Sequence, residues 1–138
     1  MADGKLSPVL RAFLNERRFA TLATVNPDGS PHQTVMWYAL QDDTVMMNTR
    51  RGRIKDQNMV RDPRVSICIE DEFRYVSIAG TVEMIDDQTR AQADIKALAV
   101  RYDGPEKAER IARDTFSKQE RITLLMSIDH VIAEGFAE

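Results

Sequence analysis

Apolar residues recur every three or four positions near the N-terminus and again after the middle of the chain, which is the spacing of one helix face. Ser7 followed by Pro8 supplies a good N-cap and first turn for the first of these stretches. Two shorter segments, one of them basic, also favour helix. The predicted helices cover Leu6–Glu16, Gly52–Val60, Gln88–Tyr102 and Glu106–Phe116.

Elsewhere apolar residues alternate with polar or small ones over short stretches, as in half-buried strands. The clearest turn between them is Asn26-Pro27-Asp28-Gly29, where Gly29 is free to adopt positive φ. The first three strands are expected to form an antiparallel meander. The predicted strands cover Phe19–Val25, Ser30–Leu40, Thr44–Thr49, Val65–Glu70, Tyr75–Ile85 and Arg121–Glu134.

About six short strands with hairpin signals favour a small antiparallel β-barrel with peripheral helices, a mostly β (α+β) fold. With 138 residues, 43% apolar and 30% charged, residues 1–138 fit one globular domain. Cys68 lies in the apolar run V-S-I-C-I and is predicted to be a buried core residue. A single cysteine excludes an intrachain disulfide and fits a reducing cytoplasm.

Net charge and hydropathy exclude two classes of partner. The net charge of −3 argues against nucleic acid, because proteins that track phosphate backbones are usually basic over a whole face. The N-terminus has no apolar signal region, and no stretch approaches the ~18 apolar residues of a membrane span. We therefore expect a cytoplasmic protein that does not associate with membranes.

Within this acidic chain, the segment Asn48–Val65 (N-T-R-R-G-R-I-K-D-Q-N-M-V-R-D-P-R-V) concentrates basic residues. A strand ends just before Gly52 and a short helix follows. Cations at a strand-to-helix junction suit an anionic group such as a phosphate, although a solvated basic helix would give the same pattern. The cations are Arg50, Arg51, Arg53, Lys55, Arg61 and Arg64.

The second predicted strand, P-H-Q-T-V-M-W-Y-A, is rich in aromatic and methionine side chains. Between Gln33 and Tyr38, alternation puts the odd-numbered residues on one face and the even-numbered residues on the other. One face should build the core. The other either packs as core too or forms a wall for a planar ring.

No arrangement of catalytic residues stands out, and the catalytic residue is unknown. His32 and His130 are far apart in sequence, and no His, Asp and Glu grouping has metal-ligand spacing. If the protein is an enzyme, a bound cofactor is expected to supply the chemistry while the protein orients it.

Five blocks of sequence follow one another in a familiar order: Ala20–His32, Val35–Tyr38, Asn48–Asn58, Arg61–Ser66 and Tyr75–Val82. Together they closely resemble the pyridoxamine 5′-phosphate oxidase-like superfamily, whose fold is the FMN-binding split β-barrel. Within it the chain is most similar to the deazaflavin (coenzyme F420)-dependent reductases, a branch abundant in actinobacteria.

The resemblance implies a homodimer of six-stranded split barrels with two cofactors in clefts across the interface. It implies an oxidoreductase in which reduced F420 delivers a hydride to a small electron-poor organic substrate. Two alternatives stay open. One is an FMN-dependent oxidoreductase of the same fold, and the other is a non-catalytic protein that carries a flavin, a deazaflavin or a haem-like ligand.

The resemblance also implies which residues bind the cofactor. Those of the basic segment hold its phosphate, those of the second strand run along its rings, and Tyr75 lies near its tail. The implied cofactor-binding residues are Gln33, Thr34, Val35, Met36, Trp37, Asn48, Thr49, Arg50, Arg53, Ile54, Lys55, Asn58 and Tyr75.

The chain departs from many relatives at Ile54, Asp56 and Gln57, where additional basic or small residues are usual, and this raises the prospect of FMN or of a member that only stores cofactor. Arg51 is a candidate to meet the acidic tail of F420, whereas Arg61 and Arg64 could instead pair with local acids. The helix Gln88–Tyr102 and the segment up to Gln119 are expected to border the open side of the cleft, where the substrate is selected.

Overall fold

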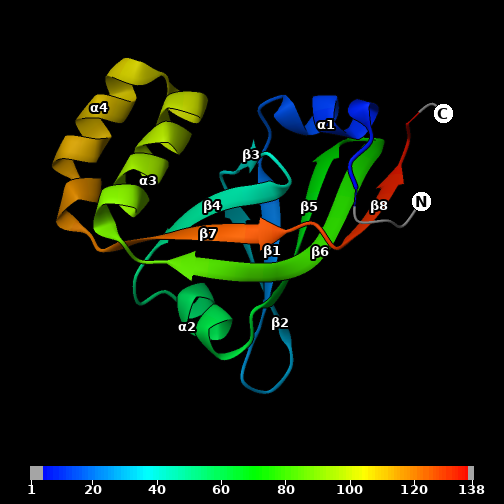
Figure 1. Cartoon of the computed structure of the whole chain (residues 1–138), viewed down its shortest axis with the longest axis horizontal. Coiled ribbons are helices and arrows are strands. Elements are labelled where there is room, and N and C mark those ends of the chain that lie inside the picture. Colours follow the sequence, from blue (N-terminus) through cyan, green and yellow to red (C-terminus); the bar gives the residue numbers. More distant parts are fainter. Residues whose placement is uncertain (1–4, 137–138) are drawn as a thin grey trace.

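The computed structural model of the chain describes residues 5–136, and it is built mostly of antiparallel sheet with helices at its edges (Figure 1). The helices are α1 Pro8–Asn15, α2 Ile54–Arg61, α3 Gln88–Asp103 and α4 Pro105–Asp114, with a 3-10 turn, η1, over Phe116–Lys118. The strands are β1 Ala20–Val25, β2 Pro31–Met36, β3 Ala39–Gln41, β4 Thr44–Arg50, β5 Arg64–Asp71, β6 Arg74–Ile85, β7 Arg121–Ser127 and β8 His130–Glu134.

The eight strands form one sheet in the order β2-β1-β5-β6-β7-β4-β3, with β8 paired to β6 outside this path. Strand β6 joins the two halves. Its first part pairs with β5 and β8, and its last four residues, from Val82 to Ile85, pair with β7. Just before this change of partner, Gly80 passes so close to β7 that a Cβ atom there would collide with the Ser127 carbonyl oxygen.

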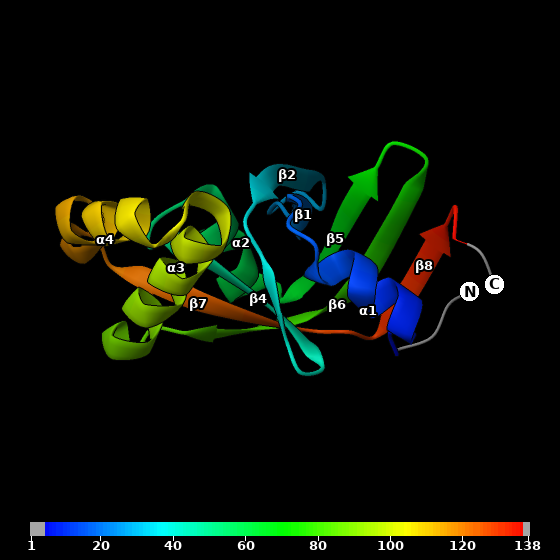
Figure 2. The ribbon, with the colours of Figure 1, turned by 90° about the horizontal axis from the view of Figure 1, so that it is seen from above.

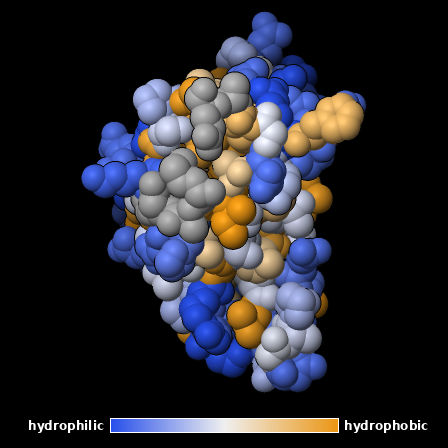
Figure 3. Space-filling view, turned by 90° about the vertical axis from the view of Figure 1, so that its right-hand side faces the viewer, coloured by the Kyte–Doolittle hydropathy of each residue, from blue (hydrophilic) through white to orange (hydrophobic). Residues whose placement is uncertain are grey.

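Two apolar clusters hold the molecule together. Helix α1 adds Leu10, Phe13 and Leu14 to the larger one, which lies on the inner face of the sheet. The smaller one joins α3 and α4 to β4, with Leu98 and Phe116 among its members. Figure 2 shows α3 and α4 at one end of the molecule and α1 and β8 at the other. At the α1 and β8 end, apolar side chains are scattered among hydrophilic ones (Figure 3).

The structure has helices in all four segments where they were predicted. The side chain of Ser7 caps α1, because its Oγ accepts a hydrogen bond of 3.3 Å from the Leu10 amide. Pro8 occupies the first turn, as expected from the sequence. Helix α3 ends at Gly104, whose φ of 89° lies in the left-handed region that glycine tolerates.

The prediction of six strands was wrong, because two predicted strands are each split in two. Ser30–Leu40 breaks at Trp37 and Tyr38 into β2 and β3, and Arg121–Glu134 breaks after Ser127 into β7 and β8. The backbone amide of Tyr38 donates to the Tyr102 hydroxyl (3.1 Å) rather than to a neighbouring strand. A partner on α3 therefore interrupts the ladder.

Both antiparallel pairings of the predicted three-strand meander are present, β1 with β2 and β3 with β4, but the break at Trp37 and Tyr38 separates them, so the meander is not continuous. Among residues 5–136, β2 pairs only with β1, whereas β3 pairs with β4 and β4 with β7. The sheet is consequently not closed into a barrel: β2 and β3 stand at the two ends of its path.

Cys68 is exposed, so its predicted place in the core was wrong. In β5 the side chains of Ile67 and Ile69 point into the core, and alternation turns Cys68 to the opposite face. There it lies level with Thr21 of β1 and Ser77 of β6. None of the helices within the described residues is both long and apolar enough to cross a bilayer.

Candidate functional site

The basic segment folds as a tight junction between β4 and α2. Gly52 adopts a φ of 96°, a conformation that a residue with a Cβ would resist, and its amide donates to the buried Asp56 carboxylate at 2.7 Å. Arg53 is the N-cap of α2, and no side chain caps the helix there. The positive end of the helix is therefore left for another negative group.

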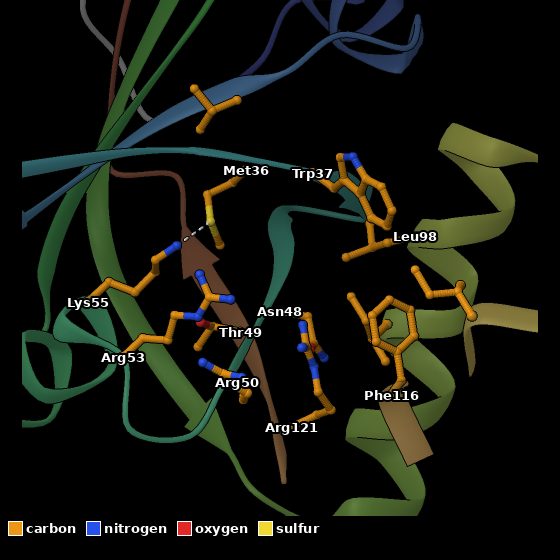
Figure 4. Close-up of a pocket in the computed structure, with 13 residues that line it drawn as sticks. Met36, Trp37, Asn48, Thr49, Arg50, Arg53, Lys55, Leu98, Phe116 and Arg121 are labelled. Atoms are coloured by element: carbon orange, nitrogen blue, oxygen red, sulfur yellow. Dashed lines mark hydrogen bonds between the residues drawn. The ribbon is translucent and has the colours of Figure 1, made fainter. Parts of the chain in front are cut away.

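A pocket of about 300 Å³ lies beside this junction (Figure 4). Cationic and polar side chains from β4, β7 and the start of α2 line one part of it, and apolar side chains from α3, α4 and η1 line the other. The end of β2 lies along its edge. The lining residues are Val35, Met36, Trp37, Asn48, Thr49, Arg50, Arg53, Lys55, Ile95, Leu98, Ile111, Phe116 and Arg121.

Lys55 is the most unusual of these residues because only 7% of it is exposed. Its ammonium group contacts the sulfur of Met36 at 3.3 Å, and no carboxylate among residues 5–136 pairs with it. Burial lowers the pKa of Lys55, and the nearby charges of Arg53 and Arg121 lower it further. A buried cation without a counter-charge is costly unless an anion binds.

Arg121 has the same character. It is 8% exposed, and burial, followed by the charges of Arg53 and Arg50, lowers its pKa to about 10. Neither Arg50, Arg53 nor Arg121 forms an ion pair with any carboxylate that the structure describes. Four cations thus converge on one pocket with no acidic residue in its lining.

Two of the remaining cations of the basic segment, Arg51 and Arg64, are already paired with carboxylates. Arg51 is held by Glu120 at 3.0 Å and by Asp86 at 3.2 Å, and the hydrogen bond that Arg51 donates to Glu120 raises the pKa of Arg51. Arg64 binds Asp62 at 2.7 Å and lowers the pKa of that carboxyl to about 2. The two readings of the basic segment therefore each describe part of it: some cations make local ion pairs, and others face the pocket.

Arg61 also points away from the pocket. Its guanidinium donates to the Val25 carbonyl oxygen and, at 3.0 Å, to the side-chain oxygen of Asn58. The Asn58 amide in turn donates to Thr24 at 3.1 Å and to Asn26 at 3.0 Å. Asn58 therefore fastens α2 to β1 and the turn after it.

Eight of the residues inferred from the resemblance line the pocket, and five do not. Those in the lining are Val35, Met36, Trp37, Asn48, Thr49, Arg50, Arg53 and Lys55. Outside it are Gln33 and Ile54, which are exposed, Thr34, which is half-buried, and the structural residue Asn58. Tyr75 lies in the other half of the sheet, paired with Glu70 and Glu134.

Thr34 and Asp56 each carry a buried polar group, and neither residue lines the pocket. The Thr34 hydroxyl has no hydrogen-bond partner among the described residues. Asp56, at a position where the resemblance led us to expect a basic or small residue, is 3% exposed and accepts a hydrogen bond from the Gly52 amide. It shapes the turn.

The sequence pattern missed Arg121. It begins β7 and pairs across the sheet with Arg50, a relation that only the strand register reveals. The apolar wall formed by Ile95 and Leu98 of α3, Ile111 of α4 and Phe116 lies in the segment that was expected to border the cleft. No group of His, Cys, Asp and Glu side chains within residues 5–136 is arranged to hold a metal ion.

Comparison with known proteins identifies the fold family. The sequence model of the family described as pyridoxamine 5′-phosphate oxidase matches residues 6–121, a span that contains the whole pocket lining. The chain belongs to the pyridoxamine 5′-phosphate oxidase family. The superfamily inferred from the five sequence blocks is thereby confirmed. No curated protein matches the sequence closely enough to count as a relative.

Several solved structures resemble the chain over most of its length. The conserved hypothetical protein Rv2991 from Mycobacterium tuberculosis is 29% identical, with a TM-score of 0.80 over 96% of this chain and 86% of that one. A structure named F420 reductase is 26% identical, with a TM-score of 0.75 over 92% of this chain and 98% of that one. HutZ, a heme storage protein from Vibrio cholerae, is 17% identical with a TM-score of 0.73 over 96% and 97% of the two chains, and shares the fold.

Proposed function

We propose that this protein is an oxidoreductase that binds coenzyme F420 and uses it to reduce a small, electron-poor organic molecule. One observation carries the proposal: Arg50, Arg53, Lys55 and Arg121 line one pocket, two of them are buried, and no carboxylate balances them. Such a site suits a phosphate-bearing ligand. The choice of F420 is supported by the likeness to the F420 reductase over nearly the full length of both chains.

Arg53 and Lys55 would hold the coenzyme phosphate at the start of α2. Arg53 offers a planar fork of donors and Lys55 a point charge, and the uncapped N-terminus of α2 adds its dipole. The residues present fit this role, because a phosphate would supply the negative charge that the buried Lys55 lacks. The paired Arg51 is left out of the site.

The end of β2 would orient the ring system, with Val35, Met36 and Trp37 along the edge of the pocket. When bound in its reduced form, the coenzyme would supply a hydride, and the substrate would take a proton from solvent to complete a two-electron reduction. The protein's contribution is to hold ring and substrate in contact and to keep part of the site apolar.

The proposal includes a homodimer in which a second copy covers the outer face of the sheet. At the centre of that face the register brings together six small uncharged residues, each of them exposed or half-buried. They are Thr21, Ala23, Ser66, Cys68, Ser77 and Ala79. A flat surface of small neutral side chains suits close packing against an identical sheet.

The test is a fluorescence titration of the purified protein with F420 and, separately, with FMN. We expect F420 to bind more tightly than FMN, and its reduced form to be oxidised when a suitable acceptor is added. Tighter binding of FMN would favour the flavin alternative. Tight binding without turnover of any reductant would favour the carrier alternative.

A pair of variants connects this result to the pocket. The double variant Arg53→Ala/Lys55→Ala should lose most of its affinity for F420. Arg64→Gln is the matched control, because it removes a nearby cation whose charge is already paired with Asp62. If both proteins bound F420 as well as the unmodified chain, the cation pocket would not be the coenzyme site.

A further inference from the structure

Arg121 is held in place entirely by neutral groups. Its Nε donates to the side-chain oxygen of Asn48 at 3.0 Å and its Nη1 to that of Gln119 at 2.8 Å. Nη2 has no hydrogen-bond partner among residues 5–136. Arg121 is thus a fixed, buried cation with one set of donors still available.

The acceptors around Arg121 are themselves fixed. The Asn48 amide donates to the Ala91 carbonyl oxygen at 3.0 Å and contacts the Thr123 hydroxyl at 3.5 Å. Thr123 in turn donates to Asp94 at 2.7 Å. The nearest carboxylate in this network therefore acts on Thr123, and the charge of Arg121 stays uncompensated.

The surroundings of Arg121 differ from those of Lys55. Its guanidinium lies 5.0 Å from the centre of the Phe116 ring, and the side chains of Leu98 and Ile95 line the same part of the pocket. Figure 4 shows Arg121 between the Arg50 and Arg53 side chains and the apolar group of Leu98 and Phe116. Lys55 lies at the other end, beside Met36 and the start of α2.

We propose that Arg121 is the anchor of a second anion subsite, which takes the carboxylate of an otherwise apolar small molecule. A cation that lies among apolar side chains is complementary to a ligand with an apolar body and one negatively charged end. This inference rests on the proposed function: the ligand at Arg121 is the substrate that accepts the hydride. The pocket then holds two negative groups, the coenzyme phosphate near Lys55 and the substrate carboxylate at Arg121, which accounts for its four cations.

The subsite is tested in ligand-free protein with benzoate as the probe, benzyl alcohol as its uncharged counterpart, and inorganic phosphate as the probe of the other subsite. Calorimetric titration should detect benzoate binding and no benzyl alcohol binding. Benzoate and phosphate should bind together, each with its affinity little changed by the other. Mutually exclusive binding would mean a single anion site and would overturn the proposal.

Variants provide a second, independent readout. Arg121→Gln should weaken benzoate binding by about tenfold or more, the loss of a charge-assisted hydrogen bond, and should weaken phosphate binding much less. Lys55→Met should do the reverse. Arg121→Lys, which restores a charge, should recover part of the benzoate affinity. Unchanged benzoate affinity in a folded Arg121→Gln protein would refute the role of Arg121, and the competition experiment decides the matter if that variant does not fold.

Catalysis links the subsite to the reaction. With F420 bound, an acceptor that carries a carboxylate should show a lower KM than its methyl ester. Arg121→Gln should remove this difference while lowering the affinity for F420 far less than Arg53→Ala/Lys55→Ala does. If the unmodified protein bound benzoate but not F420, the proposed function would fail while the subsite would stand. Equal KM values for acid and ester would overturn the assignment of the substrate.

Discussion

At the scale of single residues, Lys55 and Arg121 set the character of the pocket. Both are buried cations that the fold holds without a carboxylate. Residues of this kind lower the stability of the ligand-free protein and strengthen its binding to an anion. The Lys55→Met variant separates the effect on stability from the effect on anion binding.

Replacing Lys55 with Met keeps the length and apolar stem of the side chain and removes the charge. We expect the free energy of unfolding of the ligand-free protein to rise by about 1 kcal/mol, because an unpaired buried charge disappears. Phosphate binding should weaken by roughly 1.5–3 kcal/mol. Urea denaturation and a phosphate titration measure the two quantities, and a variant that is less stable but binds phosphate normally would contradict this account.

The lowered pKa of Lys55 gives anion binding a pH dependence. Only the charged form holds an anion, so the affinity for sulfate, whose own charge is constant, should fall as pH rises through that lowered pKa. Lys55→Arg stays charged throughout and should flatten the decline. Affinity that fell equally in both proteins would assign the titration to another group.

The lowered pKa of Arg121 affects stability in the opposite direction to the effect of the Lys55 shift on anion affinity. Folding lowers the pKa of Arg121 from its ordinary value to about 10, so between about pH 10 and that ordinary value the unfolded chain holds more protons than the folded one. The contribution of Arg121 to stability therefore rises with pH in that window.

At the scale of elements, the position of α2 decides whether Arg53 and Lys55 face the pocket. Asn58 fastens this helix by hydrogen bonds to Thr24 and Asn26. Strand β6 plays the corresponding role for the sheet, because it changes partners beside Gly80. The hydrogen bonds of Asn58 and the close approach of Gly80 to β7 can each be tested by one substitution.

Asn58→Ala should lower the free energy of unfolding by roughly 1–3 kcal/mol, since it leaves buried partners unsatisfied. Anion affinity should fall as well, because α2 loses its attachment. Val60→Ala is the matched control on the same helix, where the side chain is 68% exposed and little change is expected. Thermal unfolding of the three proteins gives the comparison.

Gly80→Ala should destabilise the protein by roughly 1–3 kcal/mol, because the added methyl group meets the Ser127 backbone and one strand must shift. Glu83→Ala on the same strand changes an exposed side chain and serves as the control. Equal denaturation midpoints for the two variants would show that the strands separate there at no cost.

At the scale of the whole molecule, the open sheet and the open pocket both favour a second copy. We expect a mass in solution near twice 15.7 kDa. Cys68→Glu would place a charge in the middle of the outer face and should give monomers with weaker F420 binding. Ala97→Glu adds the same charge on α3, away from that face, and should leave the mass unchanged. Analytical ultracentrifugation distinguishes these outcomes, and a dimeric Cys68→Glu protein would place the interface elsewhere.

Local patterns were sufficient for the helices, the turn at Asn26 and most strand positions, because caps, breakers and periodicity act over a few residues. They were also sufficient to find the cation cluster and, through the resemblance to a family, most of the pocket lining. They failed at Tyr38, where a distant hydroxyl interrupts a strand, and at Cys68, where alternation overrides the apolar composition of the run.

The sequence by itself determined the family, the mostly antiparallel fold and the presence of a basic junction before α2. Only the tertiary structure decided which cations are paired and which face the pocket, since Arg51 and Arg53 are indistinguishable in composition and differ only in their neighbours. Only the tertiary structure identified Arg121 as part of the pocket, because this residue is distant from the basic segment in sequence and adjacent to it in space. Charge compensation depends on distances between atoms, and those distances are set when the strands pair and α3 packs against them.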